Sequence, residues 1–209
     1  MITIKKGSEP HEWTKKRATP GASFESIPEL RDSLLKEQGY ICAYCMCSVP
    51  NRNSSVGSKI EHIKPRSLYP PLAMDYGNMV ICCPGETNGE SHCDTKKANS
   101  EIRFSPFEPQ TQKSISYSSR DGAIKSDNND WNEDMDTVLN LNHSLLKANR
   151  KKTLEGVIEK LGKNTGKWKE ATLEKLFQQW SKFDNSGKYN PYCGIVQWYL
   201  NKKLWFASP

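Results

Sequence analysis

The stretch Ser58–Pro65, SKIEHIKP, places a carboxylic acid beside a histidine, as Glu61 and His62. Histidine is the side chain whose ordinary pKa lies nearest to neutral pH, which makes His62 a candidate general base. Oxygen ligands suit Mg²⁺ and Mn²⁺, so Glu61 is a candidate ligand for such a cation. Because isolated Glu-His pairs are also common on ordinary surfaces, their role depends on the residues that the fold places around them.

A cluster of cysteines surrounds this stretch in the sequence. Six of the seven cysteines lie between residues 42 and 93, and the first two form a C-x2-C pair in CAYC. Such clustering is more typical of a metal site than of disulfides, and zinc binds four ligands in a tetrahedron. We therefore predict a structural zinc held by Cys42, Cys45, Cys83 and Cys93. The spacing leaves open Cys47 in place of Cys45, Cys82 in place of Cys83, and His92 in place of Cys93.

The elements that must position these residues are short. Ile60–Ile63 has the pattern of a strand end, Met79–Cys82 that of a strand, and the segment HCDTKKAN that of a helix start. Neighbouring residues of a strand face opposite sides, so Glu61 and His62 can serve one site only where the strand breaks into a loop. Pro65 favours such a break. Together, the three segments predict a strand–strand–helix unit that zinc ligands hold at both ends.

The order of these residues resembles the HNH, or ββα-metal, nuclease family in its zinc-stapled branch. The matching positions are Cys42 and Cys45, Glu61-His62, Asn78, Asp94 directly after Cys93, and Lys97. Relatives more often have His or Asn where Asp94 stands. Many also have a tighter C-x2-C where this chain has CPGETNGESHC. Because a carboxylate is a good magnesium ligand, the first departure bears on metal preference rather than on activity.

The resemblance implies phosphodiester hydrolysis with defined roles. Glu61 and Asp94 are expected to hold one Mg²⁺ or Mn²⁺ against the scissile phosphate, and His62 to activate a water molecule. Asn78 is expected to bond to the backbone where the strand ends and so to orient His62. The zinc has no open coordination position and is expected to be structural only.

Two lysines are candidates for contact with the substrate. Lys64 follows the Glu-His pair, and Lys97 follows the last cysteine in the family pattern. Both are expected to contact the phosphates of a nucleic acid. A site of this kind engages phosphate and neither requires nor excludes a 2′-hydroxyl, so DNA and RNA, including tRNA, both remain open as substrates.

A longer set of segments narrows the resemblance. LLKEQGYICAYC, DYGNMVICCPG, FSPFEP and LNLNHSLLKANR are similar to the PtuB-type HNH proteins of Septu and retron antiphage systems. This resemblance implies a PtuA-type ATPase partner, and in retron versions a reverse transcriptase with its single-stranded DNA. The expected function is thus that of a nuclease effector in antiphage defence.

The fold class expected for the chain is α+β, with a zinc-stapled ββα-metal core between an N-terminal helix and a C-terminal helical region. We expect an extended arm over 1–25, the nuclease core over 26–110, and a hairpin with helices over 111–209. Ser26 is the expected N-cap of the first helix, and Asp121-Gly122 the turn of the hairpin. Apolar residues at helical spacing predict three helices after residue 150. They include Leu154, Leu173 and Ile195.

The net charge and the hydropathy of the chain limit the kinds of partner that we expect. The 209 residues carry a net charge of +6, and residues 143–176 hold nine basic and four acidic side chains. This is consistent with a polyanionic partner. No apolar run reaches the length of a membrane span, and the first residues lack the apolar core of a signal peptide. We therefore expect a cytoplasmic protein with no membrane partner.

Two other functions compete with the nuclease. One is a zinc module that binds nucleic acid without cleaving it, and the other is an adaptor that docks an ATPase through the C-terminal helices. Trp198, Trp205 and Phe206 are the aromatic residues expected to contribute to such a docking surface, whereas His11, His143 and Cys193 are expected to have no catalytic or ligand role.

Overall fold

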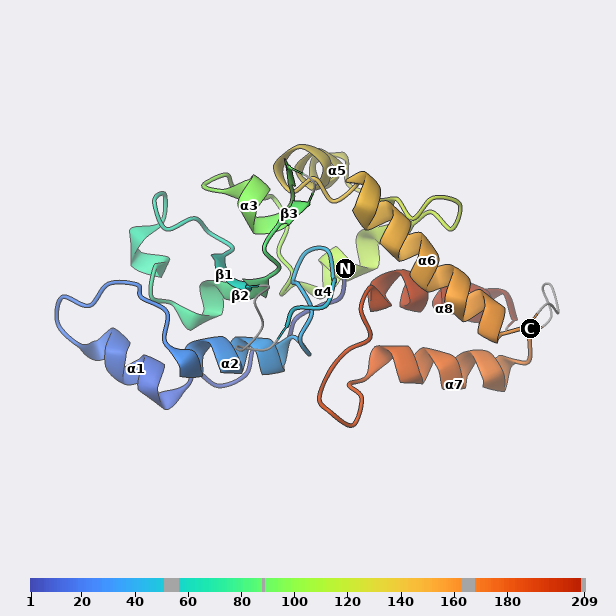
Figure 1. The fold of residues 1–209 in the computed structure, drawn as a ribbon, viewed down its shortest axis with the longest axis horizontal. Coiled ribbons are helices and arrows are strands. Elements are labelled where there is room, and N and C mark those ends of the chain that lie inside the picture. The colour runs from blue at the N-terminus through green and yellow to red at the C-terminus, as the bar shows by residue number, and fades with distance from the viewer. Residues whose placement is uncertain (51–56, 88, 163–167, 208–209) are drawn as a thin grey trace.

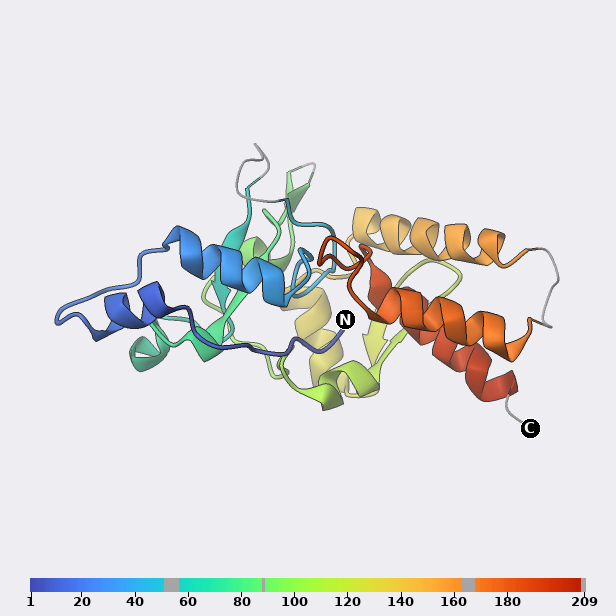
Figure 2. The same ribbon diagram turned by 90° about the horizontal axis from the view of Figure 1, so that it is seen from below.

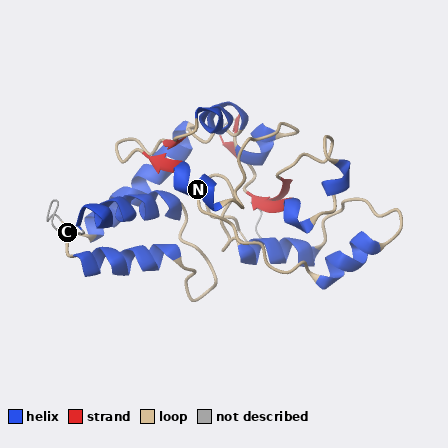
Figure 3. Cartoon of the chain, turned by 180° about the vertical axis from the view of Figure 1, so that it is seen from behind, coloured by secondary structure: helices blue, strands red, loops and turns tan. Residues whose placement is uncertain are grey.

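A computed structural model of the chain describes residues 1–50, 57–87, 89–162 and 168–207, with the backbone alone at 206 and 207. This part of the chain forms eight α-helices and three two-stranded antiparallel sheets, so the fold is α+β as predicted. Helices dominate the molecule, and the strands are short pairs between them (Figure 3).

The first half of the chain contains α1 (His11–Ala18), α2 (Pro28–Glu37), β1 (Lys59–His62), the 3-10 turns η1 (Pro70–Leu72) and η2 (Tyr76–Asn78), β2 (Met79–Cys82), β3 (Glu86–Thr87), β4 (Glu90–Ser91) and α3 (Cys93–Lys97). The second half contains α4 (Pro109–Ser114), β5 (Ile115–Tyr117), β6 (Ile124–Ser126), α5 (Asn129–Glu133), the π-helical turn η3 (Asp134–Val138), α6 (Ser144–Lys160), α7 (Glu170–Ser181) and α8 (Cys193–Ala207). Figure 1 shows an elongated molecule with α1, α2, β1 and β2 toward one end and α6, α7 and α8 toward the other.

Strands β1 and β2 form the antiparallel pair that carries the Glu-His stretch. Glu61 lies opposite Val80, and His62 lies opposite Met79. All four residues of β2 are buried, which agrees with its continuous apolar sequence MVIC. The two predicted strands are present, and a short helix, α3, begins at Cys93 after the intervening β3–β4 pair.

The N-terminal segment differs from the extended arm expected over residues 1–25. Residues 11–18 form α1, and Trp13 is fully buried, with its indole Nε1 donating to the carbonyl of Met74 at 3.2 Å. Ile4 is also buried, and its N–H donates to the carbonyl of Pro106 at 2.8 Å. Few apolar residues anchor a mostly polar segment, which is why composition alone indicated an arm. Figure 2 shows this segment running beneath the strands toward the middle of the molecule.

Helix α2 begins one residue later than a Ser26 cap requires. Its N-cap position is Ile27, which supplies no side-chain hydrogen bond, and Pro28 occupies the first turn. The prediction of Ser26 as the cap is therefore wrong. Proline at the start of a helix has no N–H to satisfy and a backbone angle already suited to the helix, so this start does not depend on a side-chain cap.

The predicted hairpin is formed by β5 and β6, with Ile115 opposite Ser126 and Tyr117 opposite Ile124. Gly122 has a φ of +76°, and a Cβ at this position would lie 2.2 Å from the carbonyl oxygen of Lys147 in α6. Only glycine fits so close to another backbone in this conformation. The Asp-Gly turn thus also sets how closely the hairpin approaches α6.

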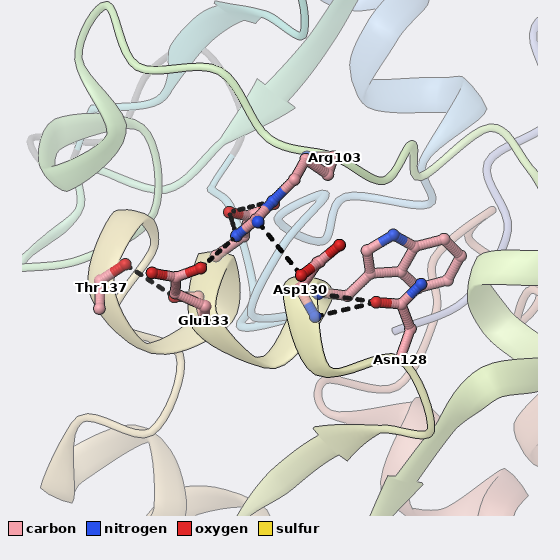
Figure 4. Close-up of polar contacts among 7 residues, drawn as sticks. Arg103, Asn128, Asp130, Glu133 and Thr137 are labelled. Carbon is pink, nitrogen blue, oxygen red and sulfur yellow. Dashed lines mark hydrogen bonds and ion pairs between the residues drawn. The ribbon is translucent and has the colours of Figure 1, made fainter.

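Arg103 ties the loop after α3 to η3. Its Nη2 donates to Asp134 Oδ1 at 2.7 Å, and its backbone N–H donates to Oδ2 of the same buried carboxylate at 2.6 Å. Glu133 and Asp130 form further ion pairs with its guanidinium, at 2.7 Å and 3.4 Å (Figure 4). Asn128 caps α5 through Oδ1, which accepts from two backbone N–H groups of the first turn. This cluster fixes the segment that leaves the strand region.

The C-terminal helices bury the apolar residues predicted from their spacing. Leu154 in α6, Leu173 in α7, and Ile195 and Leu200 in α8 are at most 2% exposed. Trp205, near the end of α8, is 75% exposed. Among the described helices, none has both the length and the apolar character that crossing a membrane requires.

Candidate metal and catalytic site

Four buried cysteines come together beside the β1–β2 pair. The sulfur atoms of Cys42, Cys45, Cys83 and Cys93 all lie within 4.8 Å of one another. A Zn–S bond of about 2.3 Å in a tetrahedron separates sulfur atoms by about 3.8 Å. The distance between Cys45 Sγ and Cys83 Sγ is 3.8 Å, so the donors fit a zinc ion in both chemistry and spacing.

The structure also decides among the alternatives that spacing left open. Cys82 is buried at the end of β2, one residue before Cys83, and lies outside the set of four. Cys47 is half-buried and lies outside the set of four. His92 is a neighbour of the cluster rather than a member, with Nδ1 3.2 Å from Cys93 Sγ. Cys193 is buried in α8 and also lies outside the set.

One tight turn after α2 and another after β2 bring the cysteines together. The first pair lies in a turn in which the N–H of Cys42 donates to the carbonyl of Cys47 at 2.9 Å. Ala43, within this turn, donates its N–H to the carbonyl of Ile81 at 3.0 Å and so joins the turn to β2. After Cys83, Gly85 has a φ of +74°, and a Cβ there would lie 2.4 Å from the carbonyl of His92. Cys93 thus reaches the cluster although the CPGETNGESHC segment is longer than the C-x2-C pair that many relatives have.

A cleft of about 430 Å³ opens next to this cluster. Glu61, His62 and Asp94 all line it, although they come from β1 and from α3. The two residues of the Glu-His pair are the last two of β1, and the chain leaves the strand directly after His62. The three candidate catalytic side chains therefore share one cleft.

Glu61 is buried in a network of polar groups. Its Oε1 accepts from Lys97 Nζ at 2.7 Å and from the hydroxyl of Tyr44 at 3.1 Å. Asp94 lies within hydrogen-bonding reach of the same carboxylate. Burial, followed by the proximity of Asp94, raises the pKa of Glu61 to about 8. Two carboxyl groups that share a site favour either a shared proton or a bound cation, which is the electrostatic property expected of a divalent metal site.

His62 is held in one orientation by its surroundings. Its Nε2 lies 3.0 Å from the carbonyl oxygen of Ala73, which can only accept, so Nε2 carries the proton and Nδ1 does not. The ring edge packs against Phe24, with ring centroids 4.5 Å apart. Burial lowers the pKa of His62 to about 4, and the imidazole is neutral at physiological pH. A neutral imidazole with an unprotonated Nδ1 has the form that a general base requires.

Asn78 holds two backbone segments that follow His62. Its Oδ1 accepts from the N–H of Lys64 at 2.8 Å, and its Nδ2 donates to the carbonyl of Lys64 at 2.9 Å. Nδ2 also donates to the carbonyl of Leu72 at 3.2 Å, one residue before the carbonyl that meets His62. Asn78 therefore makes the backbone contacts that were expected of it.

The two candidate phosphate-binding lysines lie in different environments. Lys97 was expected to meet substrate, but its side chain is 0% exposed, and its ammonium binds Glu61 and the carbonyl of His62. A buried ammonium needs such partners, and this one is not placed on a surface open to phosphate. Lys64 is 43% exposed, forms an ion pair with Glu101 at 3.0 Å, and lines a different pocket from the cleft.

Sequence reasoning did not single out three residues that the structure places at the site. Tyr44 lies between the cysteines of CAYC and contacts Glu61. Phe24 packs against His62, and the guanidinium of Arg66 lies over the Phe24 ring, 4.7 Å from its centroid. Arg66 is four residues after His62 and could have been noticed as an exposed cation near a histidine. For Phe24, nothing in the local sequence indicates that it meets the strand.

The histidines expected to be non-catalytic lie outside the cleft. His11 is exposed at the start of α1. His143 caps α6, accepting from the N–H of Leu145 at 3.2 Å, and its Nε2 lies 2.8 Å from Glu90. Both of its ring nitrogens thus have partners in the fold, which is consistent with a structural role.

Comparison of the sequence with models of known protein families gives no match, and comparison with curated proteins gives none either. What the residues themselves establish is an α+β chain with four buried cysteines that could hold a zinc ion beside a cleft lined by two carboxylates and a neutral histidine.

Proposed function

We propose that the chain is a metal-dependent endonuclease of the HNH type that acts as the effector of an antiphage defence system. The observation that carries the proposal is a single cleft lined by Glu61, His62 and Asp94 beside four clustered cysteines. The family pattern in the sequence calls for the same combination of groups. An idle zinc module would not need two carboxylates and an unprotonated imidazole nitrogen in one buried site.

The zinc of this proposal is a structural ion held by the four cysteines. Four thiolates fill its tetrahedron, so it supplies folding energy rather than chemistry. Glu61 and Asp94 would hold the second cation, Mg²⁺ or Mn²⁺. When bound, that cation would supply positive charge against the scissile phosphate and the leaving oxygen.

The chain's own groups would perform the proton transfer. His62 Nδ1 would accept a proton from a water molecule as the water oxygen attacks phosphorus. The bond from phosphorus to the 3′ oxygen would break, and the 3′ oxygen would take a proton from solvent to leave as a hydroxyl. The contact of Nε2 with the Ala73 carbonyl keeps Nδ1 directed to this task. Asn78 positions His62 through its bonds to the backbone of Lys64, two residues after His62, and of Leu72, next to the Ala73 carbonyl that meets the ring.

The surroundings of the cleft suit a phosphodiester substrate. Lys59 and Arg66 line it together with the acidic groups, and both side chains are exposed. Lys64 would contact nucleic acid at the flank of the cleft rather than at its centre. Both DNA and RNA, including tRNA, fit a site that engages phosphate.

A PtuA-type ATPase is the proposed partner, together with a retron reverse transcriptase and its single-stranded DNA in a retron context. This part of the proposal is supported by the sequence resemblance. Of the aromatic residues considered for docking, Trp198 is half-buried against Tyr117, whereas Trp205 is 75% exposed. The side chain of Phe206 lies outside the described residues. Trp205 is therefore the position at which a docking surface is best tested.

The test is the substitution His62→Ala in the complex of this chain with its ATPase. We expect cleavage of DNA or RNA in the presence of Mg²⁺ or Mn²⁺ to fall about 10²–10⁴-fold, because the general base is lost. Zinc content and thermal unfolding should stay as in the wild type. His11→Ala, the same change at an exposed histidine, is the matched control and should leave the rate unchanged.

Each other outcome has a defined meaning. Cleavage by the His62→Ala variant near the wild-type rate, with normal zinc content, would contradict the assignment of the base. If the wild-type complex binds DNA or RNA but cleaves neither with any divalent metal, the chain is a non-catalytic nucleic-acid-binding or adaptor module instead.

A further inference from the structure

The tyrosine between the first two cysteines reaches the candidate catalytic carboxylate. Tyr44 is fully buried, and its hydroxyl donates to Glu61 Oε1 at 3.1 Å. The side chain belongs to the CAYC turn, whose backbone is fixed at Cys42 and Cys45 by the cluster and at Ala43 by β2. A rigid turn therefore carries a hydrogen-bond donor directly to the proposed site of the divalent cation.

The contacts of Glu61 are divided unequally between its two oxygens. Oε1 accepts from both Tyr44 and Lys97, at 3.1 Å and 2.7 Å. Within the described part of the chain, no hydrogen-bond donor meets Oε2. Asp94 approaches the same carboxylate from α3. The carboxylate is thus anchored through Oε1, while Oε2 has no donor among the described residues.

We propose that Tyr44 is a positioning residue that couples the cysteine turn to the divalent-cation site by fixing the carboxylate of Glu61 through Oε1. This inference rests on the proposed function, since it concerns the cation that Glu61 and Asp94 would share. Groups that orient a metal ligand commonly change metal affinity by about 10–100-fold when removed.

The contact itself agrees with a donor role. The tyrosine hydroxyl has one proton to donate, and its acceptor is Glu61 Oε1, which also accepts from the ammonium of Lys97.

Tyr44→Phe removes the hydroxyl and keeps the buried ring. The full-length, zinc-loaded protein is titrated with Mn²⁺, and free Mn²⁺ is followed by electron paramagnetic resonance. We expect the half-saturating Mn²⁺ concentration to rise about tenfold. Zinc content and thermal unfolding should be close to those of the wild type. Cleavage by the variant should recover toward the wild-type rate as Mn²⁺ is raised, because the ligand is misplaced rather than lost.

Tyr76→Phe is the matched control. The Tyr76 hydroxyl is also hydrogen-bonded, but to Ser33 and Glu37, which lie outside the cleft. This variant should leave the half-saturating Mn²⁺ concentration unchanged. An equal shift in both variants would show a general effect of losing a buried hydroxyl and would overturn the proposal.

Glu61→Gln separates the inference from the function on which it rests. If wild type and Glu61→Gln bind Mn²⁺ equally, the cation site is elsewhere, and both the proposed cation site and the role of Tyr44 fail. If Glu61→Gln weakens binding but Tyr44→Phe matches the wild type, only the role of Tyr44 is overturned. If both variants bind Mn²⁺ more weakly and keep a normal zinc content, the result supports the proposal that Tyr44 couples the cysteine turn to the cation site.

Discussion

The strand region and the C-terminal helices of this molecule are stabilised in different ways. Between residues 42 and 97, the buried set includes Glu61, His62, Asn78 and Lys97, together with the four clustered cysteines. In α6, α7 and α8, the buried set is mainly apolar, with side chains such as Leu154 and Leu200. The first region thus depends on ligands and paired polar groups, and the second on packing.

The size of the elements explains the difference. Strands β1 and β2 have four residues each, and a two-stranded pair of this length is at best marginally stable in water. Helices α6, α7 and α8 have 17, 12 and 15 residues, enough to bury a continuous apolar face. A short sheet can present charged groups at its surface, but it needs another source of stability, and the cysteine cluster is positioned to supply it.

The two regions meet at the cysteine turn. The N–H of Tyr192 donates to the carbonyl of Met46 at 2.8 Å, and a Cβ on Gly194 would lie 2.7 Å from Met46 Cε. Deletion of α8 would therefore expose the side of the turn that holds Cys45. For this reason the contributions of the two regions to stability are better tested by single substitutions than by truncation.

The largest effect is expected from removing a cysteine of the cluster. Cys93→Ser should abolish stoichiometric zinc binding and unfold the strand region, because structural zinc contributes about 10–16 kcal/mol of apparent binding free energy in small zinc domains. Hydrogen exchange should accelerate most in β1, β2 and α3, and less in α6 and α8. Zinc content by elemental analysis and exchange by mass spectrometry are the measurements.

Cys193→Ser is the control for that change. It replaces an equally buried thiol in α8 and should leave zinc content as in the wild type. If wild-type protein contains no zinc, or if both variants lose it equally, the contrast between the two regions is incorrect.

An intermediate effect is expected from a core change in the helices. Leu200→Ala should lower the free energy of unfolding by about 3 kcal/mol, since a fully buried leucine leaves a cavity when truncated. Zinc content should be unaffected. Denaturant unfolding gives the free energy, and Leu145→Ala, at a leucine that is 39% exposed, should change it by far less. Loss of zinc in the Leu200 variant would show that the helices, and not the cluster, maintain the strand region.

The smallest effect on stability, with a measurable effect on binding, is expected at Arg66. Its guanidinium is exposed at the cleft, and the described residues offer it no carboxylate partner. Arg66→Ala should therefore leave the free energy of unfolding unchanged and weaken nucleic-acid binding to a similar degree for all sequences. The slope of log K against the logarithm of the salt concentration should become shallower by about one, which corresponds to the loss of one phosphate contact. Fluorescence anisotropy over a range of salt concentrations provides the test.

Arg120, exposed in the β5–β6 turn, is the matched control for that substitution. Arg120→Ala should leave the salt dependence as it is in the wild type. An unchanged slope in the Arg66 variant would remove this residue from the binding surface.

Local chemistry and periodicity determined much of the molecule from the sequence. The clustered cysteines indicated the four-donor set because zinc chemistry limits which side chains and how many can bind. The strands around Glu61 and Asn78, the Asp-Gly turn and the three C-terminal helices followed from short patterns in neighbouring residues. Such features depend on interactions within a few residues, so they can be predicted without knowing the fold.

The tertiary structure decided what depends on residues distant in the chain. It placed Cys83, and not Cys82, with the other three cysteines, and it buried Lys97 against Glu61 instead of exposing it. It also folded part of the predicted arm into α1 and placed Phe24 on His62. Burial and pairing arise only when separate segments pack together, and no local pattern encodes which atom a buried lysine or tyrosine will meet.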